Sequence, residues 1–132
     1  VYSHVFHLVS DLNITLDSKK NIFDVIKATF PAGTMTGTPK IEAMKLIEQF
    51  EGVHRGLYAG AIGTITLDGN AILALCIRTA LYYAGVYYIR ASAGIVADSI
   101  PENEWNETLN KLAATYSTIT GKSIFEVMEE EQ

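Results

Sequence analysis

In residues 1–30, the pattern of apolar and polar residues changes from one typical of a strand to one typical of a helix. Residues 1–10 (VYSHVFHLVS) are rich in β-branched and aromatic side chains, which predicts a strand. His7 would share one face of that strand with its valines. Residues 11–20 are polar and predict a loop, whereas residues 21–30 carry apolar side chains at helical spacing. This part of the chain therefore predicts a strand, a loop and a short amphipathic helix.

A loop rich in small and polar residues follows. Residues 31–40 (PAGTMTGTPK) contain two glycines, two prolines and three threonines. Thr38 and Pro39 favour a helix start, with Thr38 as N-cap and Pro39 as the first helical residue, and the helix would end at Phe50. Such a loop before a helix is suited to an anionic ligand. It is equally the pattern of an ordinary capped loop.

The middle of the chain has the pattern of antiparallel strands. A strand is expected through about Leu67, followed by a tight turn at Asp68-Gly69 and a second strand over residues 71–82. Ala84-Gly85 marks another turn before a strand over residues 86–91. These segments predict a three-stranded meander, and the whole chain an α+β unit.

One charged side chain interrupts the second of these strands. Arg78 stands within an otherwise apolar run, LALCIRTALYY. A guanidinium in such surroundings needs a carboxylate partner, which either the protein or a bound substrate can supply. Both alternatives remain open from the sequence.

A long helix is predicted after residue 100. The residues Ser99-Ile100-Pro101-Glu102 have the form of a capping box, with Pro101 in the first turn. Glu104, Glu107 and Lys111 then lie on one face of the helix. The two carboxylates suit a hard divalent cation, but they also suit a solvated face with a Glu107–Lys111 ion pair. A short surface helix is expected in the tail, residues 121–132.

Composition narrows the functional classes. The 132 residues are enough for one domain with a core, and 48% hydrophobic with 19% charged residues is a globular composition. A net charge of −5 argues against a nucleic-acid-binding protein. No apolar run predicts a membrane span or a signal peptide, and Val1 in place of methionine suggests a processed or excised fragment. The single cysteine, Cys76, lies in an apolar run and is expected to be a buried reduced thiol, in keeping with a cytoplasmic protein.

Five separated motifs give the chain a specific resemblance. In order, they are VFHLVS, FPAGTMTGTPKIEAMKLIEQFE, RGLYAGAIG, IRTA and AGIVADSIPENEWNETLNK. Together they resemble the chorismate-utilising enzymes, and the PAGT and YAGA segments favour anthranilate synthase component I. Alternatives within the family are aminodeoxychorismate synthase component I and isochorismate or salicylate synthase. A fragment that acts only as a binding or structural module is the alternative of another class.

The resemblance implies a fold and a reaction. Residues 1–120 would be the C-terminal half of the chorismate-binding catalytic domain, and residues 121–132 a tail. The reaction would join chorismate and ammonia and then release pyruvate to give anthranilate, in tryptophan biosynthesis. The ammonia would come from a glutamine amidotransferase subunit, component II.

The resemblance also implies roles for particular residues, carried over by position. Glu104 and Glu107 would help hold Mg²⁺, while Tyr58 and Arg78 would hold the pyruvyl carboxylate of chorismate. Gly94 would let the backbone approach the ring carboxylate, and Lys111 would neutralise the carboxylate cluster. The catalytic candidates are His7, next to the reacting ring, and Thr34, in the loop at the substrate.

Two residues depart from the family pattern, and one motif of the family is missing. Ser92 stands where glycine is usual, and Thr38 where alanine is usual; either change is neutral or narrows the pocket. The upstream acidic motif that completes the Mg²⁺ site is absent from these residues. The 132 residues alone are therefore expected to be inactive, and a half-domain with open strand edges is expected to self-associate.

Overall fold

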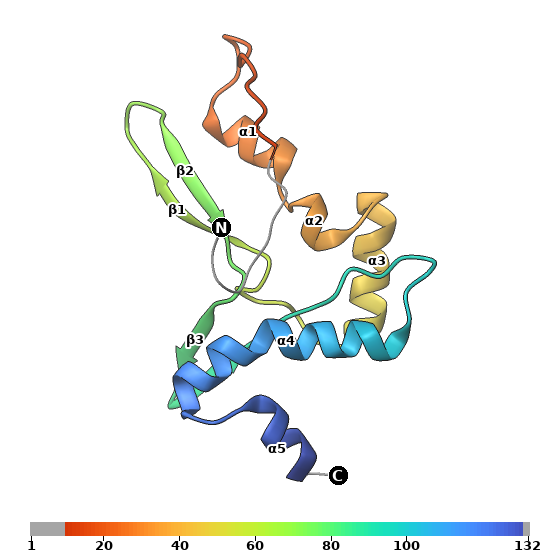
Figure 1. Ribbon diagram of the computed structural model, residues 1–132. Coiled ribbons are helices and arrows are strands. Elements are labelled where there is room, and N and C mark those ends of the chain that lie inside the picture. The colour runs from red at the N-terminus through yellow and green to blue at the C-terminus, as the bar shows by residue number, and fades with distance from the viewer. Residues whose placement is uncertain (1–9, 131–132) are drawn as a thin grey trace.

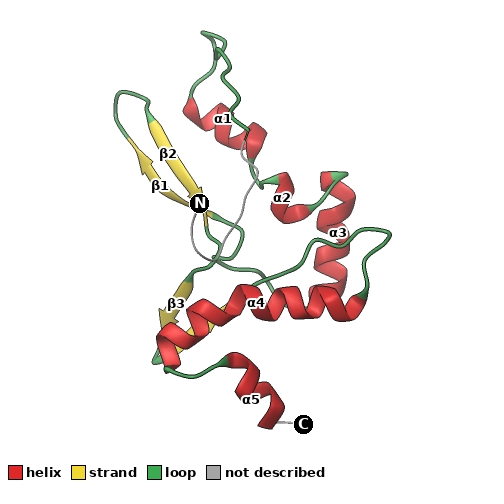
Figure 2. Ribbon diagram, viewed as in Figure 1, coloured by secondary structure: helices red, strands yellow, loops and turns green. Residues whose placement is uncertain are grey.

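The computed structural model describes residues 10–130, in which three helices are followed by two short hairpins and then by two more helices (Figures 1 and 2). This confirms the α+β expectation, while the expected first strand and His7 lie outside the described residues. In chain order, the elements are α1 (Ile22–Thr29), α2 (Gly33–Thr36), α3 (Lys40–Glu51), β1 (Ala61–Ile65), β2 (Ala71–Leu75), β3 (Ala80–Tyr83), β4 (Val86–Ile89), α4 (Pro101–Thr120) and α5 (Ile124–Glu130).

Helix α1 is fixed at its start by a capping box. The Asn21 side chain accepts hydrogen bonds from the backbone N–H groups of Phe23 and Asp24, at 2.9 and 3.3 Å. The Asp24 carboxylate accepts in return from the Asn21 N–H at 3.0 Å. Two of the N–H groups that a helix start leaves without partners are satisfied in this way. The helix expected over residues 21–30 is thus confirmed.

The caps expected for two other helices are wrong. Helix α3 begins at Lys40 with Pro39 as its N-cap, so Thr38 does not cap it. Helix α4 has Ile100 as its N-cap and no side-chain capping bond. The hydroxyl of Ser99 instead accepts from the Val96 N–H at 3.0 Å, so it closes the preceding loop and not the helix.

The strands form two separate hairpins, which corrects the expected three-stranded meander. Strands β1 and β2 pair antiparallel from Ala61↔Leu75 to Ile65↔Ala71, and β3 and β4 pair from Ala80↔Ile89 to Tyr83↔Val86. Both predicted turns are present. At the second turn, Ala84 and Gly85 have φ of 50° and 84°, the positive values that a tight two-residue hairpin needs.

Arg78 is the reason that the expected long strand breaks. Its φ is 53°, in the left-handed region, so the chain cannot continue a β ladder through it. Beyond β2, Cys76 still bonds to the two residues that precede β1: its N–H donates to Gly60 O, and its carbonyl accepts from Ala59 N–H. The chain then turns away before β3 begins.

Helix α4 is the longest element and contacts both β4 and α5. In Figure 1 it runs across the lower part of the molecule, while α1 and the β1–β2 hairpin rise above it. Gly121 ends α4 in the left-handed conformation, with φ of 71°. Helix α5 then confirms the helix expected in the tail.

Little of the described chain is fully buried. Its buried apolar side chains are Cys76, Leu109 and Ile124, and Cys76 has the free, buried thiol that the sequence predicts. Apolar strand residues such as Ile62 and Ile72 remain 65% and 79% exposed. Within residues 10–130, no helix has both the length and the apolar character needed to cross a membrane.

The β1–β2 hairpin yields a stability prediction. A Cβ atom at Gly63 would lie 1.9 Å from the carbonyl oxygen of Ile72 and 2.9 Å from Leu73 Cα, so the paired backbones must separate. Gly63→Ala should lower the free energy of unfolding by about 2 kcal/mol or more, measured by urea denaturation. Gly33→Ala is the control, since a Cβ there meets nothing within 4 Å. Equal stability of the two variants would contradict the prediction.

Candidate functional site

Hydrogen bonds join three distant parts of the chain at Ser92. The hydroxyls of Tyr58 and Ser92 are 2.7 Å apart, and the Lys111 ammonium donates to the Ser92 carbonyl at 2.9 Å. The Arg78 guanidinium donates to the Lys111 carbonyl at 2.9 Å. These bonds connect three residues to which the family resemblance gave roles: Tyr58 and Arg78 at the pyruvyl carboxylate, and Lys111 at the carboxylate cluster. They come from the loop before β1, the break between β2 and β3, and α4.

Arg78 donates here to a main-chain carbonyl, and it forms no ion pair with a carboxylate among residues 10–130. Its side chain is exposed, and a guanidinium has five N–H donors. One hydrogen bond to Lys111 O orients the group without neutralising its charge. The remaining donors can meet a carboxylate at the surface.

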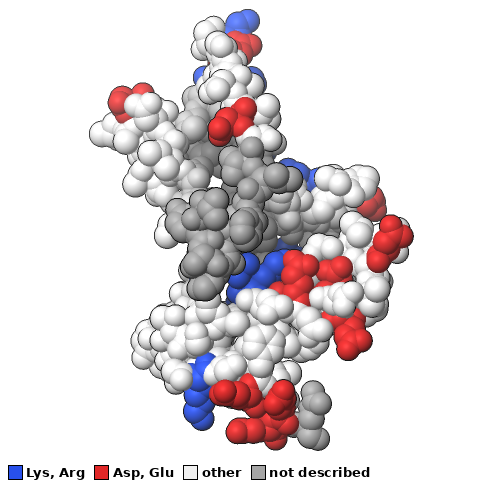
Figure 3. Space-filling model, viewed as in Figure 1, with Lys and Arg blue, Asp and Glu red and all other residues white. Residues whose placement is uncertain are grey.

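The acidic face of α4 adjoins this junction. Glu107 and Lys111 form the ion pair that the sequence offered as one alternative, with the Glu107 side chain 49% exposed. One turn earlier, Glu104 has a buried oxygen, Oε2, without a hydrogen-bond partner in the described structure. Figure 3 shows acidic and basic side chains meeting over α4.

The unpartnered oxygen of Glu104 is the feature of this face that is compatible with cation binding. A buried polar atom without a partner is energetically unfavourable, and a metal ion would satisfy it. Among residues 10–130, no three His, Cys, Asp or Glu side chains gather as a metal cage. Mg²⁺, however, commonly takes one or two carboxylates and completes its shell with water and substrate oxygens. Glu104 and Glu107 are compatible with that kind of site.

A second cluster, the Glu51–Arg55–Arg90 triad, lies beside Tyr58. Arg55 Nε donates to both oxygens of Glu51 at 2.9 and 3.1 Å, and Arg90 Nη2 donates to Oε2 at 2.7 Å. The two guanidinium carbons are 5.7 and 5.9 Å from the centroid of the Tyr58 ring, within cation–π range. The hydrogen bonds from Arg55 are the main reason that the pKa of Glu51 is lowered, and Glu51 in turn raises the pKa of Arg55.

Sequence reasoning missed this triad. The spacing of four residues between Glu51 and Arg55 at the end of a helix was a usable signal for their pairing. Nothing local connects either of them to Arg90, which is 39 residues from Glu51 in sequence. The fold alone brings the end of β4 to the end of α3.

Other predicted site residues are less closely tied to the junction. Thr34 is exposed in α2; its neighbour Met35 accepts a hydrogen bond from Arg55 through its carbonyl, at 2.8 Å. Gly94 lies in the exposed loop between β4 and α4, where an added Cβ would meet nothing within 4 Å. His7 lies outside the described residues, so its role stays a prediction.

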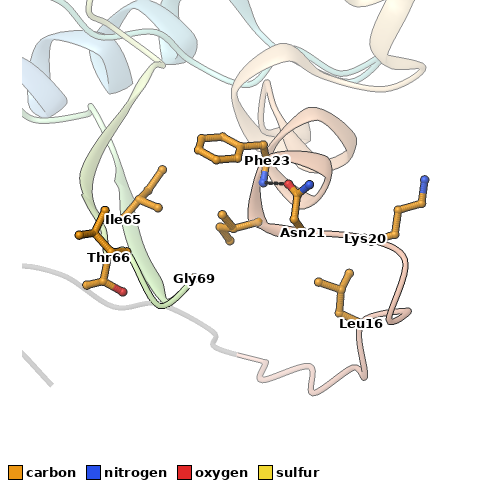
Figure 4. Close-up of a pocket in the computed structure, with 9 residues that line it drawn as sticks. Leu16, Lys20, Asn21, Phe23, Ile65, Thr66 and Gly69 are labelled. Carbon is orange, nitrogen blue, oxygen red and sulfur yellow. Dashed lines mark hydrogen bonds between the residues drawn. The ribbon is translucent and has the colours of Figure 1, made fainter.

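A hollow of about 680 Å³ lies elsewhere, between the chain around the start of α1 and the β1–β2 turn. Figure 4 shows Phe23 and Ile65 among the residues around it. Its lining is mostly apolar, and Lys20 is the charged residue in it. It contains none of the predicted site residues, and it lacks the several cations that a dicarboxylate ligand would require.

The triad predicts a pH dependence of stability. Because the pKa of folded Glu51 lies below its ordinary value of 4.5, its contribution is complete above about pH 4.5 and is lost as the pH falls through the folded pKa. Glu51→Gln should remove this part of the acid sensitivity and cost about 2 kcal/mol at neutral pH, as measured by urea denaturation. Glu48→Gln, an exposed change on the same helix, should leave stability at neutral pH unchanged. An equal loss in both variants would contradict the prediction.

Most of the chain, including the five motifs, is similar in sequence to known proteins. Residues 1–117 match the family described as chorismate binding enzymes. A 2-amino-4-deoxychorismate synthase from Streptomyces globisporus is 55% identical over 123 residues, which cover 93% of this chain and 25% of the relative. An anthranilate synthase component 1 from Aquifex aeolicus is 49% identical over 131 residues, covering 99% of this chain and 25% of the relative.

A third relative matches over a similar stretch of the chain. The anthranilate synthase component 1 of Saccharolobus solfataricus is 52% identical over 118 residues, which cover 89% of this chain and 28% of the relative. The chain thus spans about a quarter of the length of these curated relatives. The resemblance drawn from the motifs is confirmed: the chain belongs to the family of chorismate binding enzymes.

Proposed function

We propose that the complete protein is an anthranilate synthase component I, which converts chorismate and ammonia to anthranilate and pyruvate. The observation that supports this most is the chain of hydrogen bonds at Ser92, which connects Tyr58 and Lys111 and, through the Lys111 carbonyl, Arg78, next to the acidic face of α4. Chorismate carries two carboxylates, so its recognition requires separate groups for each. Lys111 links the cations of the junction to the acidic face of α4, because its ammonium pairs with Glu107.

The proposed role of Arg78 and Tyr58 is to hold the pyruvyl carboxylate. A guanidinium pairs with a carboxylate through two parallel hydrogen bonds, and a phenolic hydroxyl can donate a third. Arg78 is oriented by its bond to Lys111 O, and Tyr58 by its contact with Ser92. Preorganised donors of this kind lose little entropy when the ligand binds.

Glu104 and Glu107 are the proposed ligands of Mg²⁺, facing the ring carboxylate of chorismate. When bound, Mg²⁺ supplies electrophilic help to the loss of the ring hydroxyl. Lys111 neutralises Glu107 when no cation is present, and the unpartnered Glu104 oxygen supports a site for one. Gly94 leaves open space in which the loop backbone can approach the ring carboxylate.

The remaining roles rest on the family resemblance. His7 is proposed to act beside the reacting ring, and Thr34 to contact the substrate from helix α2. A glutamine amidotransferase subunit is the proposed source of ammonia, because the anthranilate synthase relatives are named component 1. The cytoplasm is the proposed location.

A second candidate function has its own support. The relative with 55% identity is named for 2-amino-4-deoxychorismate, a product that is still an aminated chorismate. An enzyme of that kind would add nitrogen to the ring and would not release pyruvate. The two functions share substrate binding and differ in the final elimination.

The product identifies which candidate is right. The complete protein, supplied with chorismate, ammonia and Mg²⁺, should release anthranilate and pyruvate in equal amounts, measured by fluorescence and by a coupled pyruvate assay. An aminated product without pyruvate would support the second candidate, and no consumption of chorismate would overturn both. The 132-residue chain alone should be inactive, because the upstream acidic motif is missing.

The two proposed metal ligands can be tested in the same assay. Glu107→Gln should lower kcat/KM by about 100-fold, the scale expected when a charge that holds the metal at the reacting group is lost. It should also weaken Mg²⁺ binding measured by calorimetry. Glu102→Gln is the matched control, since Glu102 is an exposed carboxylate in the first turn of the same helix. Similar losses in both variants would contradict the assignment.

Gly94 gives a test that separates binding from folding. Gly94→Ala should leave the thermal unfolding midpoint unchanged, because its Cβ meets no protein atom within 4 Å. It should raise KM for chorismate by about tenfold or more, since the methyl group occupies space proposed for the substrate. An unchanged KM would remove Gly94 from the proposed site.

A further inference from the structure

Ser92 places a hydroxyl where glycine is usual in the family pattern, and the structure gives that hydroxyl a specific partner. Its Oγ lies 2.7 Å from the Tyr58 hydroxyl oxygen. Its carbonyl accepts from Lys111 at 2.9 Å, so the backbone of Ser92 is held to α4 as well. Glycine could keep the carbonyl contact but has no atom with which to reach Tyr58.

The ring and the hydroxyl of Tyr58 are held by different groups. Arg55 and Arg90 lie near the ring, at 5.7 and 5.9 Å from its centroid, and Glu51 joins the two arginines. These contacts hold the ring but do not set the direction of the O–H bond. Ser92 is the side chain whose hydrogen bond to the Tyr58 hydroxyl is recorded in the described structure.

Two arrangements of this hydrogen bond are possible, and they differ in chemistry. If Tyr58 donates to Ser92, its proton is engaged and cannot serve a ligand. If Ser92 donates to Tyr58, the phenolic proton is available to an anion, and the first hydrogen bond strengthens the second by polarisation. An anion bound among Arg78, Tyr58 and Lys111 would favour the second arrangement.

We propose that Ser92 is a positioning residue for chorismate: its hydroxyl donates to Tyr58 and directs the phenolic proton to the pyruvyl carboxylate. This inference rests on the proposed function, because it needs a carboxylate ligand at the junction. Ser92 acts through Tyr58 and does not itself contact the reacting atoms. It therefore affects substrate binding and leaves the chemical step unchanged.

The test uses the complete protein and steady-state kinetics with chorismate. Ser92→Ala should raise KM about fivefold, the factor expected from losing one neutral hydrogen bond, while kcat changes less than about twofold. Ser92→Thr keeps a hydroxyl and should restore the wild-type KM. In the Tyr58→Phe background, Ser92→Ala should have no further effect, because the partner hydroxyl is already gone.

A matched control comes from the same loop. Ser99 is also partly exposed and accepts a hydrogen bond from Val96 N–H, but it does not contact Tyr58. Ser99→Ala should leave KM unchanged. If Ser92→Ala fails to fold, as judged by circular dichroism, Ser92→Gly takes its place, since glycine is the residue of the family pattern, and the same fivefold rise in KM is expected.

The outcomes separate this inference from the proposed function. A wild-type protein that turns over chorismate, but in which the effects of Ser92→Ala and Tyr58→Phe simply add, overturns the inference alone. A lower KM in Ser92→Gly does the same, because it shows that the serine obstructs the pocket. A wild-type protein that neither binds nor converts chorismate overturns both.

Discussion

The carboxylate of Glu51 is the interaction on which the arrangement of the candidate site depends. It binds Arg55 and Arg90 together, and so joins the end of α3 to the chain that follows β4. Arg55 is three residues from Tyr58, and Arg90 is two residues from Ser92. The Glu51–Arg55–Arg90 triad therefore largely sets the distance between the hydroxyl groups of Tyr58 and Ser92. Because the three side chains are about a quarter exposed or less, solvent screens them less than it screens a surface pair.

The cations of this region have a common pattern of partners. Arg55, Arg90, Lys111 and Arg78 each donate to a main-chain carbonyl, those of Met35, His54, Ser92 and Lys111 respectively. A carbonyl fixes the direction of a cation without cancelling its charge. Glu51 and Glu107 neutralise part of the positive charge, and the rest stays directed at the surface. The region thus favours anionic ligands although the chain as a whole is acidic.

Local sequence signals predicted the elements well and their ends less well. Helical spacing and turn residues located α1, α3, α4, α5 and both hairpin turns, because those signals act within a few residues. The break at Arg78 escaped prediction, since a positive φ at a non-glycine residue leaves no mark in composition. The Ser99 hydroxyl could accept from the first turn of α4 or from the preceding loop, and in the structure it accepts from Val96 N–H in the loop. The motifs supplied Tyr58, Arg78 and Lys111, but the contact of Ser92 with Tyr58 and the link to Arg90 depend on the tertiary fold.

The small buried core has a consequence for how this part of the chain responds to temperature. The heat capacity change of unfolding comes mainly from apolar surface that folding removes from water. In residues 10–130 taken by themselves, that removal is nearly complete for Cys76, Leu109 and Ile124, while much of the two hairpins stays exposed. The stability curve of the 132-residue chain alone is therefore expected to be flat, without the marked maximum of a densely packed domain. Polar contacts such as the triad at Glu51 then contribute an unusually large share of its folding stability.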